Sequence, residues 1–139
     1  MPSFCVIGDM NKRLSSYREL RVYQLACDLD LAIHQATKTF PPEERYSLTD
    51  QVRRSSRSIG ANLAEAWAKR RSPAHFVSKI TDADGELQET THWLGRAHAY
   101  GYLSTAVLAA NEAKCSEVGR MLGRMIAKAD SFGPPTSET

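Results

Sequence analysis

Cysteine and long apolar runs are both scarce in this chain of 139 residues. Its three cysteines, Cys5, Cys27 and Cys115, are odd in number and have no paired spacing, which argues against a disulfide framework or a zinc site. No segment approaches the roughly 20 apolar residues of a membrane span, and the start lacks the core of an export signal. We therefore expect a cytoplasmic protein without a membrane segment, a metal or a cofactor.

Enzyme motifs and strand patterns are missing as well. The sequence has no glycine-rich phosphate loop, no nucleophile elbow and no paired metal-binding histidines. It also has no run of alternating polarity that is rich in β-branched residues, the usual pattern of a half-buried strand. These absences favour an all-α protein that is not an enzyme.

Four stretches instead place apolar residues at alternating spacings of three and four, the period of a helix buried on one side. With short loops between them, they predict an antiparallel up-down four-helix bundle over residues 17–132. Residues 1–16 are expected to be loosely ordered, and residues 133–139 form a flexible tail. The predicted buried positions are Val22, Ala26, Leu29, Ile33, Ala36 and Phe40; then Leu48, Val52, Ile59, Leu63, Ala66 and Trp67; then Phe76, Ile80, Ala83, Leu87, Thr90, Leu94 and Ala97; and finally Leu108, Asn111, Cys115, Val118, Leu122, Met125, Ala129 and Phe132.

Capping residues predict where these helices begin and end. Two successive prolines close the first stretch. Ser47, with Asp50 three residues later, predicts a capping box for the second helix. Ser72 before a proline suits the start of the third. Gly101 suits the left-handed cap at its end, and Ser104 can cap the fourth helix.

Positive charge is concentrated in and around the second stretch. Residues 45–71 hold seven basic and two acidic side chains, a net +5, whereas the whole chain has +2. A charged run is often only the solvated face of a helix, but such a local field also attracts phosphate or carboxylate surfaces. Since guanidinium forks hold phosphate oxygens in pairs, we predict sequence-independent, salt-sensitive binding of RNA or DNA. The predicted contact residues are Arg53, Arg54, Arg57, Arg70 and Arg71.

The first two stretches also carry a second apolar line beside the main one. This extra surface is either a wider buried face in a small bundle or a contact between protomers packed side by side in a ring. The residues concerned are Leu25 and Ala32 in the first stretch, and Leu63 and Trp67, beside Ile59 and Ala66, in the second.

A spaced set of short motifs resembles a known family. The set comprises YREL at 17–20, FP at 40–41, ERY at 44–46, LTDQVRRS at 48–55, SI at 58–59 and NLAE at 62–65. It resembles the four-helix-bundle proteins encoded in intervening sequences of 23S ribosomal RNA. The same superfamily holds the accessory variability determinant of diversity-generating retroelements.

The resemblance implies a homopentameric barrel of four-helix protomers that are not known as enzymes. In the accessory proteins a basic surface engages nucleic acid and a reverse transcriptase. The basic positions of this chain that match are Arg53, Arg54 and either Arg70 or Arg71.

Two other functions remain open. The basic face could belong to an interaction scaffold for an acidic protein. Alternatively, Arg70 and His75, separated by four residues, resemble the ribonuclease signature of HEPN domains. There, a histidine could act as general base beside an arginine that stabilises charge on phosphate. Because this pair straddles the predicted helix start at Ser72, we expect no catalysis.

Overall fold

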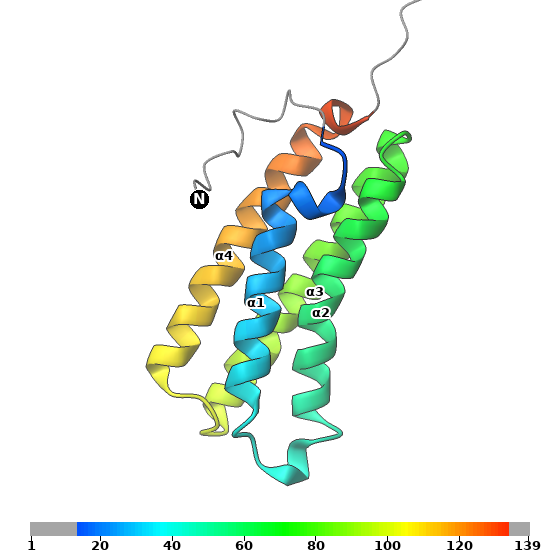
Figure 1. Cartoon of the computed structure of the whole chain (residues 1–139). Coiled ribbons are helices and arrows are strands. Elements are labelled where there is room, and N and C mark those ends of the chain that lie inside the picture. Colours follow the sequence, from blue (N-terminus) through cyan, green and yellow to red (C-terminus); the bar gives the residue numbers. More distant parts are fainter. Residues whose placement is uncertain (1–13, 134–139) are drawn as a thin grey trace, which may run out of the picture.

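The computed structural model describes residues 14–133, which form four long helices and three short 3-10 turns. Neighbouring helices run in opposite directions (Figure 1), and α4 closes the bundle against both α3 and α1. Residues 14–133 contain no strand, so the predicted all-α fold is confirmed. The helices are α1 (Arg21–Thr37), α2 (Leu48–Ala68), α3 (Pro73–Ala99) and α4 (Thr105–Ala127), and the 3-10 turns are η1 (Tyr17–Glu19), η2 (Pro42–Glu44) and η3 (Ala129–Phe132). Residues 1–13 and 134–139, where loose segments are predicted, lie outside the described part.

The core follows the predicted apolar lines closely. All seven positions predicted for α3 are buried. In α2 the predicted arc is buried apart from Trp67, which is half-buried against the core. Burying a large aliphatic or aromatic side chain stabilises a protein by roughly 1.5–3 kcal/mol. Among the described residues, this core therefore holds the four helices together without a disulfide.

The second apolar line of α2 is satisfied within one chain. Ile59, Leu63 and Ala66 have no exposed surface, and the extra residues of α1, Leu25 and Ala32, are half-buried. The wider buried face of a small bundle accounts for the pattern in α2. The second apolar line of α2 is therefore no separate evidence for contacts between protomers.

The first helix is shorter than its apolar pattern predicts. Leu20 has extended backbone angles, with φ −66° and ψ 125°, so α1 begins only at Arg21. It ends at Thr37. This residue, rather than the predicted Ala36, continues the row of buried residues along α1. Phe40 lies beyond the helix and is buried beside Tyr102, with 5.5 Å between the ring centroids. Phe40, the last residue of the predicted buried line, thus reaches the core from the turn after α1 and not from the helix.

Three of the predicted helix boundaries are confirmed. The hydroxyl of Ser72 accepts a hydrogen bond from the backbone N–H of His75 at 3.4 Å, and Ser104 does the same for Val107 at 3.1 Å. Gly101 has φ +84°, a left-handed conformation that a side chain would make costly.

The capping box predicted for α2 is wrong. The Ser47 side chain makes no capping hydrogen bond. Instead it donates to Oε1 of Glu44 at 2.6 Å, and the N–H of Leu48 reaches the same oxygen at 3.5 Å. Glu44 therefore caps α2 from η2. It also accepts a hydrogen bond from the Tyr102 hydroxyl at 2.9 Å, which joins the α1–α2 loop to the α3–α4 loop.

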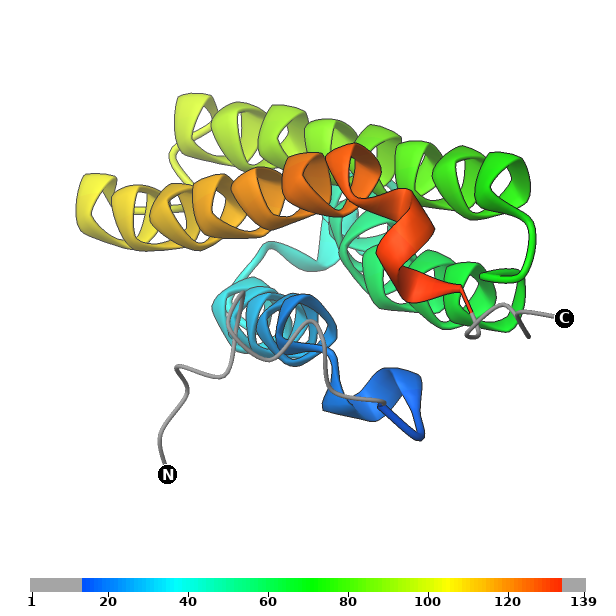
Figure 2. The same cartoon turned by 90° about the horizontal axis from the view of Figure 1, so that it is seen from above.

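The two ends of the bundle differ in what they contain. The 3-10 turns η1 and η3, where the described chain starts and stops, lie at the end that also holds the α2–α3 turn (Figures 1 and 2). The α1–α2 and α3–α4 loops lie at the opposite end. None of the helices described here combines the length and apolar character that crossing a bilayer requires.

Candidate nucleic-acid interface

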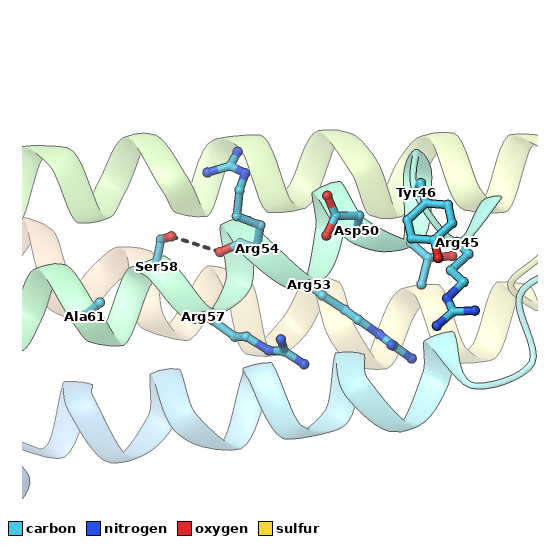
Figure 3. Close-up of a pocket in the computed structure, with 9 residues that line it drawn as sticks. Arg45, Tyr46, Asp50, Arg53, Arg54, Arg57, Ser58 and Ala61 are labelled. Carbon is cyan, nitrogen blue, oxygen red and sulfur yellow. Dashed lines mark hydrogen bonds between the residues drawn. The ribbon is translucent and has the colours of Figure 1, made fainter.

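A groove of about 540 Å³ runs along the outer face of α2. Its walls come from α2 and from the loop that leads into it (Figure 3). Arginines at positions four apart lie about 6 Å apart along a helix, which allows one extended ligand to meet several of them. The lining residues are Arg45, Tyr46, Thr49, Asp50, Arg53, Arg54, Arg57, Ser58 and Ala61.

Three of these arginines point toward α1. Arg45, Arg53 and Arg57 extend to the same side of α2 in Figure 3. Nε of Arg53 donates a hydrogen bond to the Thr37 hydroxyl at 2.7 Å, and Nη2 of Arg57 lies 3.4 Å from Nδ1 of His34. None of the three forms an ion pair with a carboxylate of residues 14–133. We refer to Arg45, Arg53 and Arg57 as the arginine row.

The electrostatics of the row extend onto α1. Asp30 faces Arg57 from α1, and its carboxyl is partly buried. Burial raises the pKa of Asp30, while the charges of Arg57 and His34 act in the opposite direction. Because desolvation is the larger effect, the pKa of this carboxyl lies above its ordinary value despite the nearby positive charges.

Arg54 points the other way, toward α3. It forms ion pairs with Glu89 and with Oε2 of Glu86, the latter at 3.5 Å. Glu89 also accepts a hydrogen bond from Nε1 of Trp93 at 3.3 Å. The positive charge of Arg54 is therefore balanced by carboxylates of the same chain, and its ion pairs link α2 to α3.

Arg70 and Arg71 lie in the turn after α2, about 20 Å from Arg57 along the helix axis. Arg70 lies over the Trp67 ring, with Cζ 4.1 Å from the centroid, and its Nη1 donates to the Trp67 carbonyl at 2.9 Å. The Arg71 side chain is exposed. The five predicted arginines are thus divided among three places: the row, the α2–α3 contact and the α2–α3 turn.

The structure does not join Arg70 and His75 into one hydrogen-bonded site. The contacts of the Arg70 guanidinium are with Trp67. His75 is exposed in the first turn of α3, and its ring makes no hydrogen bond to any residue between 14 and 133. That same stretch contains no group of three or more His, Cys, Asp or Glu side chains arranged to hold a metal ion.

Six residues of the groove were not among the predicted contacts, and Arg45, Tyr46 and Thr49 are three of them. Arg45 stands inside the basic window but before the helix, so the helical period assigns it no direction. Tyr46 is 82 % exposed, with Cζ of Arg45 5.1 Å from its ring centroid. Thr49 is only 6 % exposed, and its hydroxyl has no hydrogen-bond partner among the described residues. In the sequence, the signals were the charge of Arg45 and the aromatic ring of Tyr46, which stands next to it in the ERY motif at 44–46.

Comparison with known proteins assigns the chain to a family. The model of the family described as 23S rRNA-intervening sequence protein matches residues 18–124. A crystal structure from Bacteroides thetaiotaomicron, described as a protein with unknown function from the S23 ribosomal protein family, has a TM-score of 0.69 at 26 % identity. That match covers 76 % of this chain and 95 % of the other. No curated protein matches. Since the family model spans most of the chain, as the short motifs predicted, this protein belongs to the 23S rRNA-intervening sequence protein family.

Proposed function

We propose that this protein binds nucleic acid without sequence preference through the groove along α2, and that it acts without catalysis. The observation that carries the proposal is the arginine row. Its three guanidinium groups extend to one side of the groove (Figure 3) and form no ion pair within residues 14–133. A polyanion would supply the ion-pair partners that no carboxylate of residues 14–133 supplies to these three arginines.

The chemistry of the row suits a phosphate backbone. Nε of Arg53 is occupied by Thr37, which leaves the two Nη groups of Arg53 to hold phosphate oxygens as a pair. Arg57 follows one helical turn later, so a strand that runs along α2 meets two guanidinium groups in succession. Contacts of this kind depend on charge rather than on base sequence, and added salt weakens them.

The absence of catalysis is part of the proposal. Arg70 is held on Trp67, while the His75 ring is exposed and has no hydrogen-bond partner among the described residues that would orient it. A general base needs such orientation beside the group that stabilises the charge on phosphate. The protein should therefore leave structured and single-stranded RNA intact, and cleavage that disappears in His75→Ala would overturn this part.

The finer role that we propose is accessory to a reverse transcriptase, in a homopentamer. This role rests on the resemblance of the short motifs to the accessory variability determinant. Exposed apolar side chains such as Leu31, Val107 and Ile126 are compatible with further packing. Light scattering should give the mass of five chains, and a monomer at micromolar concentration would contradict the ring. Co-purification with a reverse transcriptase encoded nearby would support the accessory role.

The central experiment compares two double variants of equal charge. Arg53→Gln with Arg57→Gln removes two members of the row. Arg120→Gln with Arg124→Gln removes two exposed arginines, also four residues apart, from α4. Each lost phosphate contact should lower the salt slope of binding by roughly 0.7–0.9, so the first double variant should lose about 1.5. The second should retain the parental slope.

The readout is the affinity for a fluorescein-labelled RNA and for the matching DNA over a range of salt concentrations. Circular dichroism and light scattering verify that each variant stays folded and keeps its mass. If the α2 double variant binds with unchanged affinity and slope, the basic face is only a solvated surface and the proposal is wrong. If both double variants weaken equally, only the total charge matters and no groove is involved.

A further inference from the structure

An exposed aromatic ring stands at one end of the groove. Tyr46 precedes α2 and is 82 % exposed, and its side chain makes no hydrogen bond to any residue between 14 and 133. The other aromatic ring beside the basic cluster, that of Trp67, is half-buried and covered by Arg70. Tyr46 is not part of the core, and Arg45 lies over one face of its ring, which leaves the other face for an outside partner.

We propose that the ligand of the groove is single-stranded nucleic acid, and that Tyr46 stacks on one of its bases. This inference rests on the proposed function and names the kind of nucleic acid. A duplex presents phosphates to the arginines, but it keeps the faces of its bases inside its own stack. A single strand offers both phosphates and free base faces, and proteins that bind single strands combine a basic groove with aromatic platforms.

The order of residues along the groove fits one strand. Tyr46 and Arg45 lie at the end near the α1–α2 loop, followed by Arg53 and then Arg57 (Figure 3). A base stacked on Tyr46 would leave the sugar-phosphate chain running along α2 past the two arginines. Arg45 lies over one face of the ring, with Cζ 5.1 Å from its centroid, where a guanidinium can meet both the ring and a phosphate.

The negative charge of Asp50 indicates on which side of the groove the nucleic-acid strand lies. Its carboxylate is exposed and, in the view of Figure 3, lies above the arginine row, between Arg54 and Tyr46. A phosphate backbone on that side would meet a like charge, with Arg54 already paired to Glu86 and Glu89. The strand is therefore expected on the α1 side, above Arg53 and Arg57.

The test changes Tyr46 in the full chain and uses three probes of equal length. The probes are a single-stranded oligouridine, an abasic strand with the same backbone, and an RNA duplex. Tyr46→Ala should weaken binding of the oligouridine about tenfold, the usual effect of losing one stacked base. Binding of the abasic strand and of the duplex should not change. The salt slope for the oligouridine should stay the same, because no phosphate contact is removed. Tyr46→Phe keeps the ring and should bind like the parent protein.

Tyr100 provides the matched control. It is also exposed, at 54 %, and has Cζ of Arg96 5.1 Å from its ring centroid, but it does not line the groove. Tyr100→Ala should leave every affinity unchanged. An equal effect of Tyr46→Ala and Tyr100→Ala would overturn the stacking platform.

The remaining outcomes separate this inference from the proposed function. If the Arg53 and Arg57 double variant loses affinity while Tyr46→Ala binds oligouridine like the parent, the groove binds phosphates and the stacking inference alone fails. The inference also fails if the abasic strand or the duplex binds as tightly as oligouridine. If none of the three probes binds but poly-glutamate does, both proposals fail and the groove belongs to an acidic protein partner.

Discussion

Arg53 of α2 and Thr37 of α1 are joined by a hydrogen bond of 2.7 Å, in which the guanidinium Nε donates to the threonine hydroxyl. The same hydroxyl lies 2.8 Å from the carbonyl oxygen of Ile33 and donates to it. A side chain of the candidate interface is thus anchored on the neighbouring helix by a contact within the protein. Ordering a long side chain on binding costs affinity, and this anchor removes part of that cost.

Thr37→Val should weaken RNA binding severalfold without unfolding the protein. The valine keeps the shape of the side chain but cannot hold Arg53, which must then lose its rotamer freedom on binding, at a cost of roughly 0.5–1.5 kcal/mol. Thermal unfolding measures the stability of the variant, and titration with RNA measures its affinity. Thr39→Val is the control, because the exposed Thr39 hydroxyl contacts only the Ala36 carbonyl, at 3.4 Å. Equal affinity of the parent and Thr37→Val would show that the anchor has no part in binding.

Arg54→Gln should affect stability more than nucleic-acid binding. The variant loses the ion pairs to Glu86 and Glu89 that link α2 to α3. Because the Arg54 side chain is 47 % exposed, solvent screens these pairs, and the loss should not exceed about 1 kcal/mol. Urea unfolding measures this value. The salt slope of RNA binding should change much less for Arg54→Gln than for Arg53→Gln. If the two variants lower the salt slope equally, Arg54 is one of the phosphate contacts.

Glu44→Gln should remove a pH dependence of stability on the acid side. Hydrogen bonds from Ser47, then from Tyr102 and the Leu48 N–H, hold the pKa of Glu44 below its ordinary value of 4.5. The folded protein therefore binds this proton more weakly than the unfolded chain does. The resulting stability is present above that ordinary value and is lost as the pH falls through the lowered pKa.

Thermal unfolding between about pH 5 and pH 3 measures the contribution of Glu44, over the range where this carboxyl takes up its proton. The parent protein should lose more stability than Glu44→Gln over this range. Glu43→Gln, which changes the exposed neighbour, should behave like the parent. Parallel curves for the parent and Glu44→Gln would contradict the assigned role of these hydrogen bonds.

Thr49→Val should stabilise the fold and leave binding unchanged. The Thr49 hydroxyl is buried without a partner among the described residues, and an unsatisfied buried polar group costs about 1–3 kcal/mol. Replacing it with a methyl group of the same shape should raise the melting temperature. Since the hydroxyl is covered, it cannot contact RNA. The RNA affinity should therefore change by less than about twofold, a smaller change than the loss of one hydrogen bond would cause. A lower melting temperature would mean that the hydroxyl has a partner in solution.

The helices and most of the core could be predicted because a helix buried on one side repeats its apolar residues every three or four positions. The line through α3 is the clearest case, with all seven predicted positions buried. Helix starts at Ser72 and Ser104 were predictable as well, since each cap bonds within its own first turn. The start of α2 near Leu48 was also predicted correctly, but its cap was not, because the cap comes from Glu44, outside the helix.

The candidate site was less predictable because it depends on how neighbouring helices meet. The helical period places Arg53 on one line with Arg57 and turns Arg54 further from the apolar arc, but it does not say which neighbouring residue each side chain meets. In the folded chain Arg53 meets Thr37 of α1, whereas Arg54 meets Glu89, 35 positions along the chain on α3. Exposure of Tyr46 was equally hidden, since a loop residue has no periodic position. Contacts of this kind follow from the register of packed helices.

The positions of η1 and η3 have a practical consequence. Both 3-10 turns lie at the end of the bundle that holds the α2–α3 turn, whereas the α1–α2 loop lies at the opposite end (Figure 1). A spectroscopic label attached to a residue of η1 or η3 would thus lie away from the loop where the groove begins. Such a label would follow binding without blocking the groove.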